Sequence, residues 1–272
     1  MSIDETALSK GELYTIITNK SARGKKGAIV AILAGTKVEP ILEQLLKIPK
    51  SLRDEVTEIT LDMANSMKVI AKKCFPKAIQ VTDRFHVQKL ALEALQDIRI
   101  KHRWEAIDLE NKQIKESKSK QKDYLAEVFS NGDTRKQLLA RSRYLLYKAP
   151  YNWTQNQYLR SEILFEHYPD IKKAYNLVQG LRNIFNTATS IQTAYTKLAH
   201  WYKDVEQTGF KAFNTIANTI TLNYRSILNY FINRSTNASA ESFNAKIKAF
   251  RAQFRGVKNV EFFLFRLTQI FA

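Results

Sequence analysis

Short runs of apolar, β-branched and aromatic residues punctuate the first hundred residues, and turn-prone or amphipathic segments separate them. Runs of this kind, bounded by polar or Gly- and Pro-containing stretches, are typical of β-strands. The expected strands are a short one around Ile3, then Leu13–Thr18, Ala28–Leu33, Val56–Leu61 and Ala78–Thr82. The basic, turn-prone residues 19–27 join the second strand to the third, which predicts a hairpin.

Two segments between these strands carry apolar residues at the spacing of one helix face. They are Val38–Ile48, which Pro49 closes, and Met63–Phe75, which Pro76 ends. The element order is therefore β, β, β, α, β, α, β. This order favours a three-stranded antiparallel unit followed by α/β crossovers.

The pattern changes to helix almost throughout residues 85–231. Val87–Ile114 is amphipathic, and the polar residues 116–123 that follow are either a turn or an exposed helix surface. Thr154 and Gln157 have the spacing of a capping box, which predicts a helix start. Gly180 and Gly209 are expected at helix ends or kinks.

Charge changes the picture more than size does. The 272 residues fit one large domain, or a core with a substantial insertion, and they carry a formal net charge of +17. Residues 101–272 hold 27 basic and 14 acidic residues, so most of the excess lies there. Nucleic acid is the commonest partner of so basic a chain, and its binding should weaken with salt. The alternative is a generically basic protein.

One cysteine, Cys74, excludes an intramolecular disulfide and a cysteine-rich zinc site. The sequence shows neither the pattern of a signal peptide nor an apolar run long enough to span a membrane. We therefore expect a cytoplasmic protein, associated with the nucleoid, rather than a secreted or membrane protein.

Acidic residues follow the expected strands. Asp62 ends one apolar strand, Asp83 ends the next, and Asp4 lies on or just after the first. In α/β sheets such ends converge on a crevice, where crowded carboxylates need a cation to remain ionised. Hard divalent ions such as Mg²⁺ or Mn²⁺ suit oxygen ligands, and two of them support in-line phosphoryl transfer. The alternative is that each Asp only caps the helix that follows it.

Five motifs, in this order, resemble the DDE transposases of the bacterial ISL insertion-sequence group, which are related to Mutator-like transposases. They are Ile3–Thr6, Thr60–Ala64, Phe75–Ala78, Val81–Val87 and Thr236–Lys248. The resemblance implies an α/β fold with a large all-α insertion, built on an RNase H-like mixed sheet flanked by helices. It also implies residues 1–100 as the first part of the catalytic core, 101–232 as the helical insertion and 233–272 as the C-terminal core helices.

The resemblance assigns the chemistry to three acids. Asp4, Asp62 and Glu241 match the family's catalytic, metal-binding residues, and the resemblance implies two Mg²⁺ or Mn²⁺ ions as cofactor. Asp83 and His86 match an accessory Asp-x-x-His feature. His86 would either orient a DNA phosphate or brace the acidic cluster.

The last expected helix, Ala238–Phe254, supplies candidate DNA contacts. Glu241, Asn244 and Lys248 share one of its faces, so an acid for the metal lies beside an amide and an ammonium for DNA, and Arg251 adds charge. Asn237, before the helix, is a candidate cap.

Basic and aromatic residues interleave in the expected insertion, where Arg141, Arg143 and Trp153 are candidate DNA-binding residues. Aromatic rings beside cations suit distorted or single-stranded DNA. Packing in the protein core is the competing interpretation for any one Tyr or Trp.

Relatives of this group usually carry zinc-binding and helix-turn-helix segments before the first catalytic strand. Because this sequence starts two residues before Ile3, we expect either a separate N-terminal DNA-recognition polypeptide or a truncated remnant. The expected function is cleavage at insertion-sequence ends and 3′-OH strand transfer into target DNA, by a homo-oligomer on DNA. The alternatives are a non-catalytic DNA-binding or regulatory fragment and an RNase H-like nuclease of another role; the long insertion and the Glu241 motif disfavour the nuclease.

Overall fold

The computed structural model describes residues 1–9, 12–253 and 259–272. The chain clusters into two compact units, Met1–His86 with Ile220–Ala272, called here the core unit, and Val87–Thr219, called here the helical unit. These units divide at residues 86 and 219. The functional domain limits expected at residues 100 and 232 stay a prediction.

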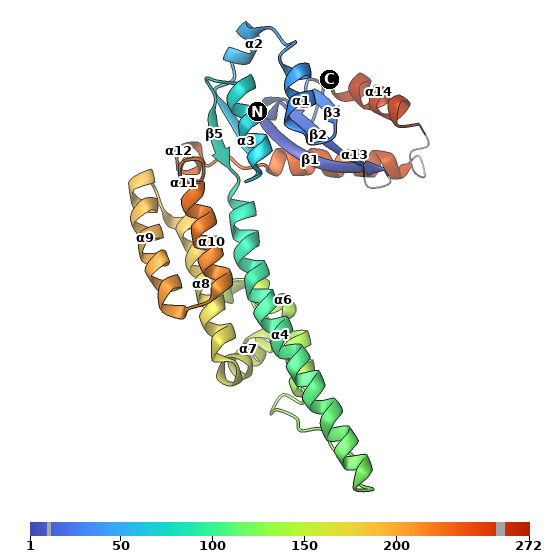
Figure 1. Cartoon of the computed structure of the whole chain (residues 1–272), viewed down its shortest axis with the longest axis vertical. Helices are drawn as coiled ribbons and strands as arrows, with labels where there is room; N and C mark the ends of the chain where they lie inside the picture. The colour runs from blue at the N-terminus through green and yellow to red at the C-terminus, as the bar shows by residue number, and fades with distance from the viewer. Residues whose placement is uncertain (10–11, 254–258) are drawn as a thin grey trace. The chain divides into compact units, whose positions relative to one another are not determined.

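One mixed sheet forms the centre of the core unit (Figure 1). Within the described residues its order is β3-β2-β1-β4-β5. Strand β1 pairs antiparallel with β2, and β2 antiparallel with β3, whereas β1–β4 and β4–β5 are parallel. The strands are β1 (Ser2–Ser9), β2 (Glu12–Thr18), β3 (Ile29–Ala34), β4 (Glu58–Leu61) and β5 (Ile79–Thr82). The α/β class and the RNase H-like mixed sheet are confirmed.

Strand β1 is longer than its sequence indicates. It pairs with β2 from Ser2, opposite Thr18, to Ser9, opposite Glu12. Polar residues fill much of it, but its place in the middle of the sheet gives it partners on both sides. Pairing therefore outweighs the weak strand propensity of its residues. As a result Asp4 lies within a central strand.

Helices cover both faces of the sheet. Alternate strand residues such as Ile3, Ile17 and Ile59 pack against α1 (Val38–Leu45) and α3 (Asn65–Cys74). Residues of the opposite parity, such as Ile16, pack against α13 (Ala238–Gln253) and α14 (Val260–Phe271). This alternation is the two-residue period of a strand with both faces buried. The sheet is thus the middle of three layers.

The remaining elements of the core unit are short. A helix not expected from sequence, α2, follows Pro49, because a proline suits the position just before a first helical turn. Their bounds are η1 (Lys20–Ala22), α2 (Lys50–Asp54), α11 (Tyr224–Leu228) and α12 (Tyr230–Asn233). The predicted C-terminal helix begins at Ala238 and is described as far as Gln253; Phe254 lies outside the described residues.

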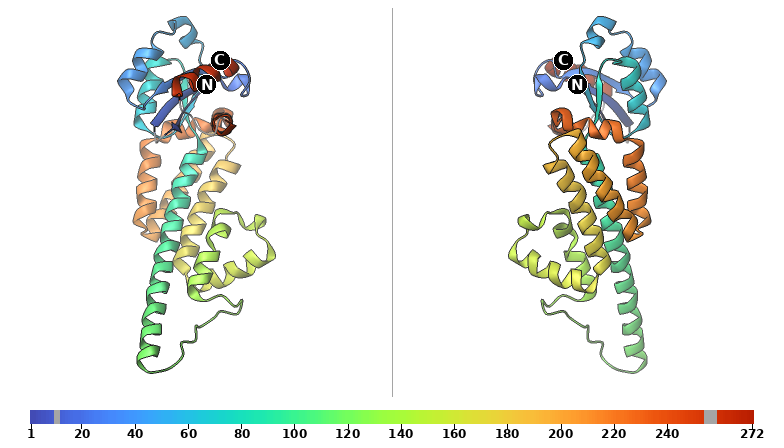
Figure 2. Two further views of the ribbon diagram at one scale, coloured as in Figure 1. Left: turned by 90° about the vertical axis from the view of Figure 1, so that its right-hand side faces the viewer. Right: turned by 90° about the vertical axis from the view of Figure 1, so that its left-hand side faces the viewer.

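Helices make up nearly all of the helical unit, and α8 and α9 lie side by side in it (Figure 2). Helices α4 and α10 each cross a boundary between the units. The bounds are α4 (Arg84–Ser119), α5 (Arg135–Arg141), α6 (Arg143–Tyr147), η2 (Pro150–Asn152), α7 (Gln155–His167), α8 (Pro169–Thr187), α9 (Ile191–Thr208) and α10 (Lys211–Leu222). In the described part of the chain, we find no helix that combines the length and the apolar character needed to cross a membrane.

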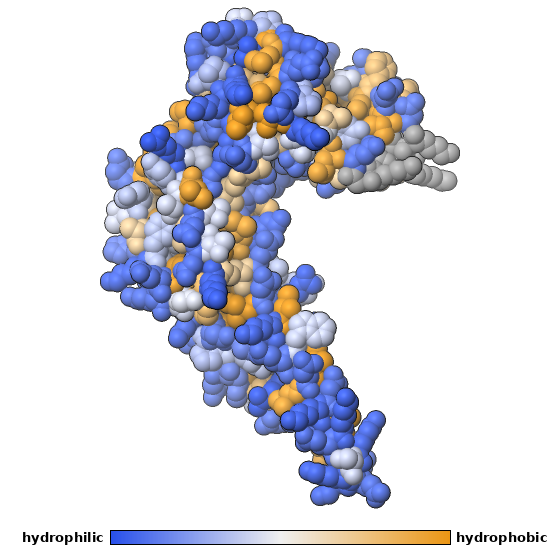
Figure 3. All heavy atoms as spheres, in the orientation of Figure 1, coloured by the Kyte–Doolittle hydropathy of each residue, from blue (hydrophilic) through white to orange (hydrophobic). Residues whose placement is uncertain are grey.

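The polar residues 116–123 were expected to form either a turn or an exposed helix surface, and the structure shows both. Helix α4 continues to Ser119 and a turn follows, in which Gln121 has a positive φ of 52°. Hydrophilic side chains cover the C-terminal part of α4 on the face seen in Figure 3. The segment is therefore an exposed helix surface and then a turn.

Two of the three predicted helix boundaries in the helical unit are confirmed. Thr154 and Gln157 form both hydrogen bonds of a capping box at the start of α7. Gly209 ends α9 in the left-handed conformation, with φ of 67°, which glycine adopts without strain. Gly180 does not end a helix, because it lies inside α8, and the alternative of a kink at this position stays a prediction. A Cβ atom at Gly180 would come within 3.3 Å of Trp201 Cδ1. The small size of Gly180 serves the close approach of two helices.

A buried carboxylate fixes the start of α5. Asp133 is fully buried, and it accepts hydrogen bonds from Arg141 and from Arg160 Nε, the latter at 2.9 Å. Burial alone would raise the pKa of Asp133, but the hydrogen bonds and charges of the two arginines lower it below its usual value. The candidate DNA contact Arg141 thus already has a partner inside the unit.

We expect Gly180→Val to destabilise the chain by about 1–3 kcal/mol, because the added atoms overpack the contact with Trp201. Urea unfolding checks this, with Lys173→Val on an exposed position of the same helix as control. Equal midpoints for the two variants would contradict the packing role of Gly180.

We expect Asp133→Asn to cost about 2 kcal/mol at pH 7, because charge-assisted hydrogen bonds to two arginines are lost. Since the pKa of Asp133 is lowered by folding, its stabilisation is present above the ordinary carboxyl pKa of about 4 and disappears as pH falls through the lower folded value. Urea titrations from pH 7 to pH 3 should show the difference between wild type and variant shrinking. Asp123→Asn, at an exposed position, should change little at any pH.

Candidate active site

Asp62 lies where β4 leaves the sheet. The strand ends at Leu61, and Asp62 follows with its Oδ1 accepting a hydrogen bond from the Ala64 amide at 2.8 Å. Ala64 is the N-cap of α3, and no side chain in the described part of the chain caps this helix, so the bond closes a turn before the helix and Asp62 is not its cap. The side chain remains half-buried and adds its negative charge to the surroundings of Asp4 and Glu5.

Asp4 projects from β1 on the side covered by α13. Its Oδ1 accepts the amide N–H of Glu5 at 2.9 Å, and its Oδ2 accepts Asn244 Nδ2 at 2.7 Å. The pairing of Asp4 with Ile16 puts both on the face that packs against α13. The hydrogen bond therefore joins the central strand to the C-terminal helix across 240 positions of sequence.

Glu241 lies in the first turn of α13 with an exposed side chain. Although the side chain is exposed to solvent, nearby protein atoms partly desolvate its carboxyl group and raise its pKa; the charges of Asp83 and Asp4 raise this pKa further, and His86 opposes them. The three predicted catalytic acids thus come from β1, the end of β4 and α13. The charge of Asp62 raises the pKa of Asp4, and the charge of Asp4 raises the pKa of Glu241.

Burial is the main reason why the acids of this region have raised pKa values, and repulsion among them adds to its effect. Burial raises the pKa of Asp4, and Asp62 and Asp83 raise it further, while the Glu5 amide and His86 lower it. The pKa of Glu5 is raised by burial and then by Asp62 and Asp4. Sequence reasoning missed Glu5, although its place next to Asp4 was a usable signal. A cation placed among these groups would relieve the repulsion.

The oxygen atoms of these acids suit a hard divalent ion, but the acids lie too far apart to bind one together as they stand. Among the described residues, no three His, Cys, Asp or Glu side chains are placed to hold a metal ion. Beside Asp4, however, Asn244 Oδ1 is buried and has no hydrogen-bond partner within the part of the chain that the structure describes. Carboxylate and amide oxygens are suitable ligands for Mg²⁺, and a buried carbonyl oxygen without a partner is costly. The residues therefore fit such an ion if the acids draw together on binding it.

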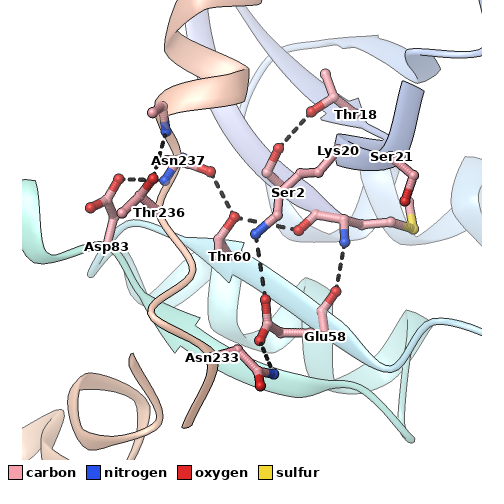
Figure 4. Close-up of polar contacts among 12 residues, drawn as sticks. Ser2, Thr18, Lys20, Ser21, Glu58, Thr60, Asp83, Asn233, Thr236 and Asn237 are labelled. Atoms are coloured by element: carbon pink, nitrogen blue, oxygen red, sulfur yellow. Dashed lines mark hydrogen bonds and ion pairs between the residues drawn. The ribbon is translucent and has the colours of Figure 1, made fainter. Parts of the chain in front are cut away.

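Asp83 has a different environment from the other acids. It is 2% exposed, and one of its oxygens accepts the backbone amide of Phe85 at 2.9 Å. The other oxygen accepts the backbone amide of Asn237 at 2.6 Å (Figure 4). One amide belongs to the start of α4 and the other to the segment before α13. Both oxygens are thus occupied by backbone N–H groups, and Asp83 positions the chain. His86 lies one turn later, half-buried, where its charge acts on Asp4 and Glu241.

The segment before α13 is fastened to β4 along its length. Asn237 Oδ1 accepts Thr60 Oγ1 at 2.8 Å, and Asn233 Nδ2 donates to Glu58 Oε2 at 3.0 Å (Figure 4). Lys20 approaches the same Glu58 carboxylate at 3.4 Å. The side chain of Asn237 therefore contacts the sheet. Its backbone carbonyl oxygen accepts a hydrogen bond from the backbone amide of Glu241. These contacts place Glu241 relative to Asp62.

The candidate DNA contacts of α13 differ in exposure. Lys248 is exposed and Arg251 is half-buried, whereas Asn244 is 8% exposed and directed at Asp4. In the structure Asn244 therefore contacts an acid of the site, and its predicted DNA contact stays a prediction.

In the helical unit, Arg143 is exposed, and its guanidinium carbon lies 5.5 Å from the ring centroid of Tyr144, which is 67% exposed. Trp153 instead packs on Tyr175, with ring centroids 5.6 Å apart, and donates its indole N–H to the carbonyl oxygen of Leu145. Core packing thus accounts for Trp153, while Arg143 and Tyr144 offer a stacking surface.

Comparison with known proteins identifies the family of the chain. The family model of ISL3-type DDE transposases, described as "Transposase", matches residues 1–267. A curated protein of Bordetella parapertussis, "Transposase for insertion sequence element IS1001", is 22% identical over 275 residues, covering 100% of this chain and 60% of that protein. No solved structure matches the chain. With a family match over nearly its full length, the chain belongs to the ISL3 family of DDE transposases.

Proposed function

We propose that the chain catalyses divalent-metal-dependent cleavage of DNA at insertion-sequence ends and then joins the freed 3′-OH to target DNA. The observation that carries this proposal is the shared electrostatic environment of Asp4, Asp62 and Glu241. Burial and mutual repulsion raise the pKa of Asp4, which feels Asp62, and of Glu241, which feels Asp4. Such strain among acids from three separate elements is typical of functional sites.

The proposed roles follow from position. Asp4 and Asp62, on the sheet, would hold one side of the metal site, and Glu241 on α13 would complete it. Mg²⁺ or Mn²⁺, when bound, supplies charge for the attacking and leaving oxygens. In the first step water attacks the phosphorus and the P–O3′ bond breaks, which leaves a 3′-OH. In the second step that 3′-OH attacks a target phosphate and a target 3′-OH departs.

Accessory residues support this site. Asp83 holds the segment that precedes Glu241, and the charge of His86 offsets part of the repulsion at Asp4 and Glu241. Lys248 and Arg251 on α13, together with Arg141 and Arg143, are the proposed DNA-binding residues, and Trp153 would support them by its packing on Tyr175. The net charge of +17 supports a polyanionic partner.

Other partners belong to the proposal as well. The chain spans 60% of the length of its curated relative. We propose that sequence-specific recognition of the ends comes from a separate N-terminal polypeptide and that the active form is a homo-oligomer on DNA. Both would complement a chain whose own residues supply the acids.

A second candidate is a non-catalytic DNA-binding or regulatory protein. The observation that favours it is the absence, among the described residues, of three side chains already placed to hold a metal. In that case the basic surface would act without the acids.

We expect Asp62→Asn and Glu241→Gln each to reduce cleavage and joining of labelled end DNA by more than about 100-fold in Mg²⁺ or Mn²⁺, because charge stabilisation at the reacting phosphate is lost. The assay is run with and without the upstream polypeptide. Glu162→Gln, an exposed acid of the helical unit, is the matched control and should retain activity. Salt-sensitive DNA binding with no metal-dependent product from any form would sink the catalytic proposal and support the second candidate.

We expect Asn244→Ala to raise the Mg²⁺ concentration needed for half-maximal activity by about tenfold, because the amide that orients Asp4 is removed. Binding to DNA in EDTA should stay unchanged. Gln253→Ala, at an exposed position of the same helix, is the control. If Asn244→Ala instead weakened DNA binding in EDTA, Asn244 would contact DNA and would not act through the metal site.

A further inference from the structure

A cavity of about 770 Å³ lies in the core unit beside the strand end that carries Asp62. Met63 and Asn65, which follow Asp62 closely in sequence, line it together with residues 222–226. This volume is within the range of small-molecule binding sites. None of the roles proposed above uses this cavity.

The floor of the cavity is tied to β5. Asn229 Nδ2 donates to the carbonyl oxygen of Gln80 at 2.9 Å, and Thr82 Oγ1 donates to Ser226 Oγ at 2.8 Å. These bonds connect α11 and the residue after it to the edge strand of the sheet. The cavity therefore has a shape that exists before any ligand enters.

The lining of the cavity includes one aromatic ring, that of Tyr224. Tyr224 is 42% exposed and Leu222 is 85% exposed, so both present apolar area at the cavity. Arg225 Nε donates to Tyr224 Oη at 3.0 Å, and its guanidinium carbon lies 5.8 Å from the ring centroid. The tyrosine ring is thus held by its neighbour, which lowers the entropy lost when another ring stacks on it.

Two cations border the same cavity. Arg225 is one, and Lys68 on α3 is the other. Lys68 is half-buried; burial lowers its pKa, and the nearby charge of Asp62 raises it. A phosphate between Lys68 and Arg225 would lie close to Asp62. Aromatic, amide and cationic groups together match the three parts of a nucleotide that proteins contact in single strands.

We propose that this cavity binds one unpaired nucleotide of the DNA strand that passes Asp62, with its base stacked on Tyr224 and its phosphate held by Lys68 and Arg225. The proposal rests on the proposed function, because Asp62 is taken there to act on DNA. It adds that the strand is locally unpaired, since the face of a base reaches an aromatic ring in a cavity only after the base leaves its stack.

The test is a site-resolved photocrosslink in EDTA, where no cleavage can occur. A single-stranded DNA octamer with one central 5-iodouracil is irradiated with the chain, and the crosslinked peptides are identified by mass spectrometry. We expect crosslinking to Tyr224, its loss in Tyr224→Ala and its retention in Tyr224→Phe, which keeps the ring. In fluorescence anisotropy, Tyr224→Ala and an abasic site in the octamer should each weaken binding by about tenfold.

Tyr195→Ala, at a 62% exposed tyrosine of the helical unit, is the matched control and should bind as the wild type does. Crosslinks confined to other residues, or equal affinity for the intact and abasic octamers, would overturn the proposal. Because the measurement needs no metal, a chain that fails to cleave DNA but crosslinks at Tyr224 would refute the catalytic function and keep the cavity assignment. If the chain cleaves DNA but Tyr224→Ala binds the octamer as the wild type does, the catalytic function stands and the cavity assignment is refuted.

Discussion

A buried carboxylate holds the two ends of the core unit together. Asp83 accepts backbone amides from the start of α4 and from the segment before α13, residues that are 154 positions apart. A buried carboxylate that lost these donors would carry an uncompensated charge, which is far more costly than the bonds themselves. The chain can therefore leave the sheet at Asp83, form an entire helical unit, and return to the same point. The contact between Asp4 and Asn244, and the position of Glu241 on α13, depend on this closure.

The closure also explains why an acid-rich site persists in a basic protein. Asp4, Glu5 and Glu241 all have raised pKa values, and burial is the leading cause for each. These acids do not stabilise one another. The hydrophobic contacts on the two faces of the sheet, and the hydrogen bonds between residues 233–237 and β4, stabilise the fold that holds them near each other. The repulsion is the consequence of a framework that is stable for other reasons. Such a framework is the condition under which strain can be kept at a site.

The elements that sequence predicts well are those whose own residues determine them. The strand before Asp62 and the capping box at Thr154 were both expected, because apolar runs and capping hydrogen bonds are local. The full length of β1 was not, since its polar residues gain their strand geometry from neighbours on both sides. Gly180 looked like a helix end, but the reason for a glycine there is Trp201, a residue of the next helix. Likewise, the three acids followed from motifs, whereas the amide of Asn237 and the contact of Asn244 with Asp4 depend on how the chain folds back.

The position of α13 has a consequence for the order of events during synthesis. Asp4 and Asp62 leave the ribosome early, on strands whose nearest partners are close in sequence. Asn237, Glu241 and Asn244 emerge only after the whole helical unit, and the contacts of Asn237 with β4 and of Asn244 with β1 form across that interval. A nascent or prematurely ended chain therefore has two acids on an incomplete sheet and no third. The fold itself delays the assembly of a complete set until synthesis has passed the helical unit and reached α13.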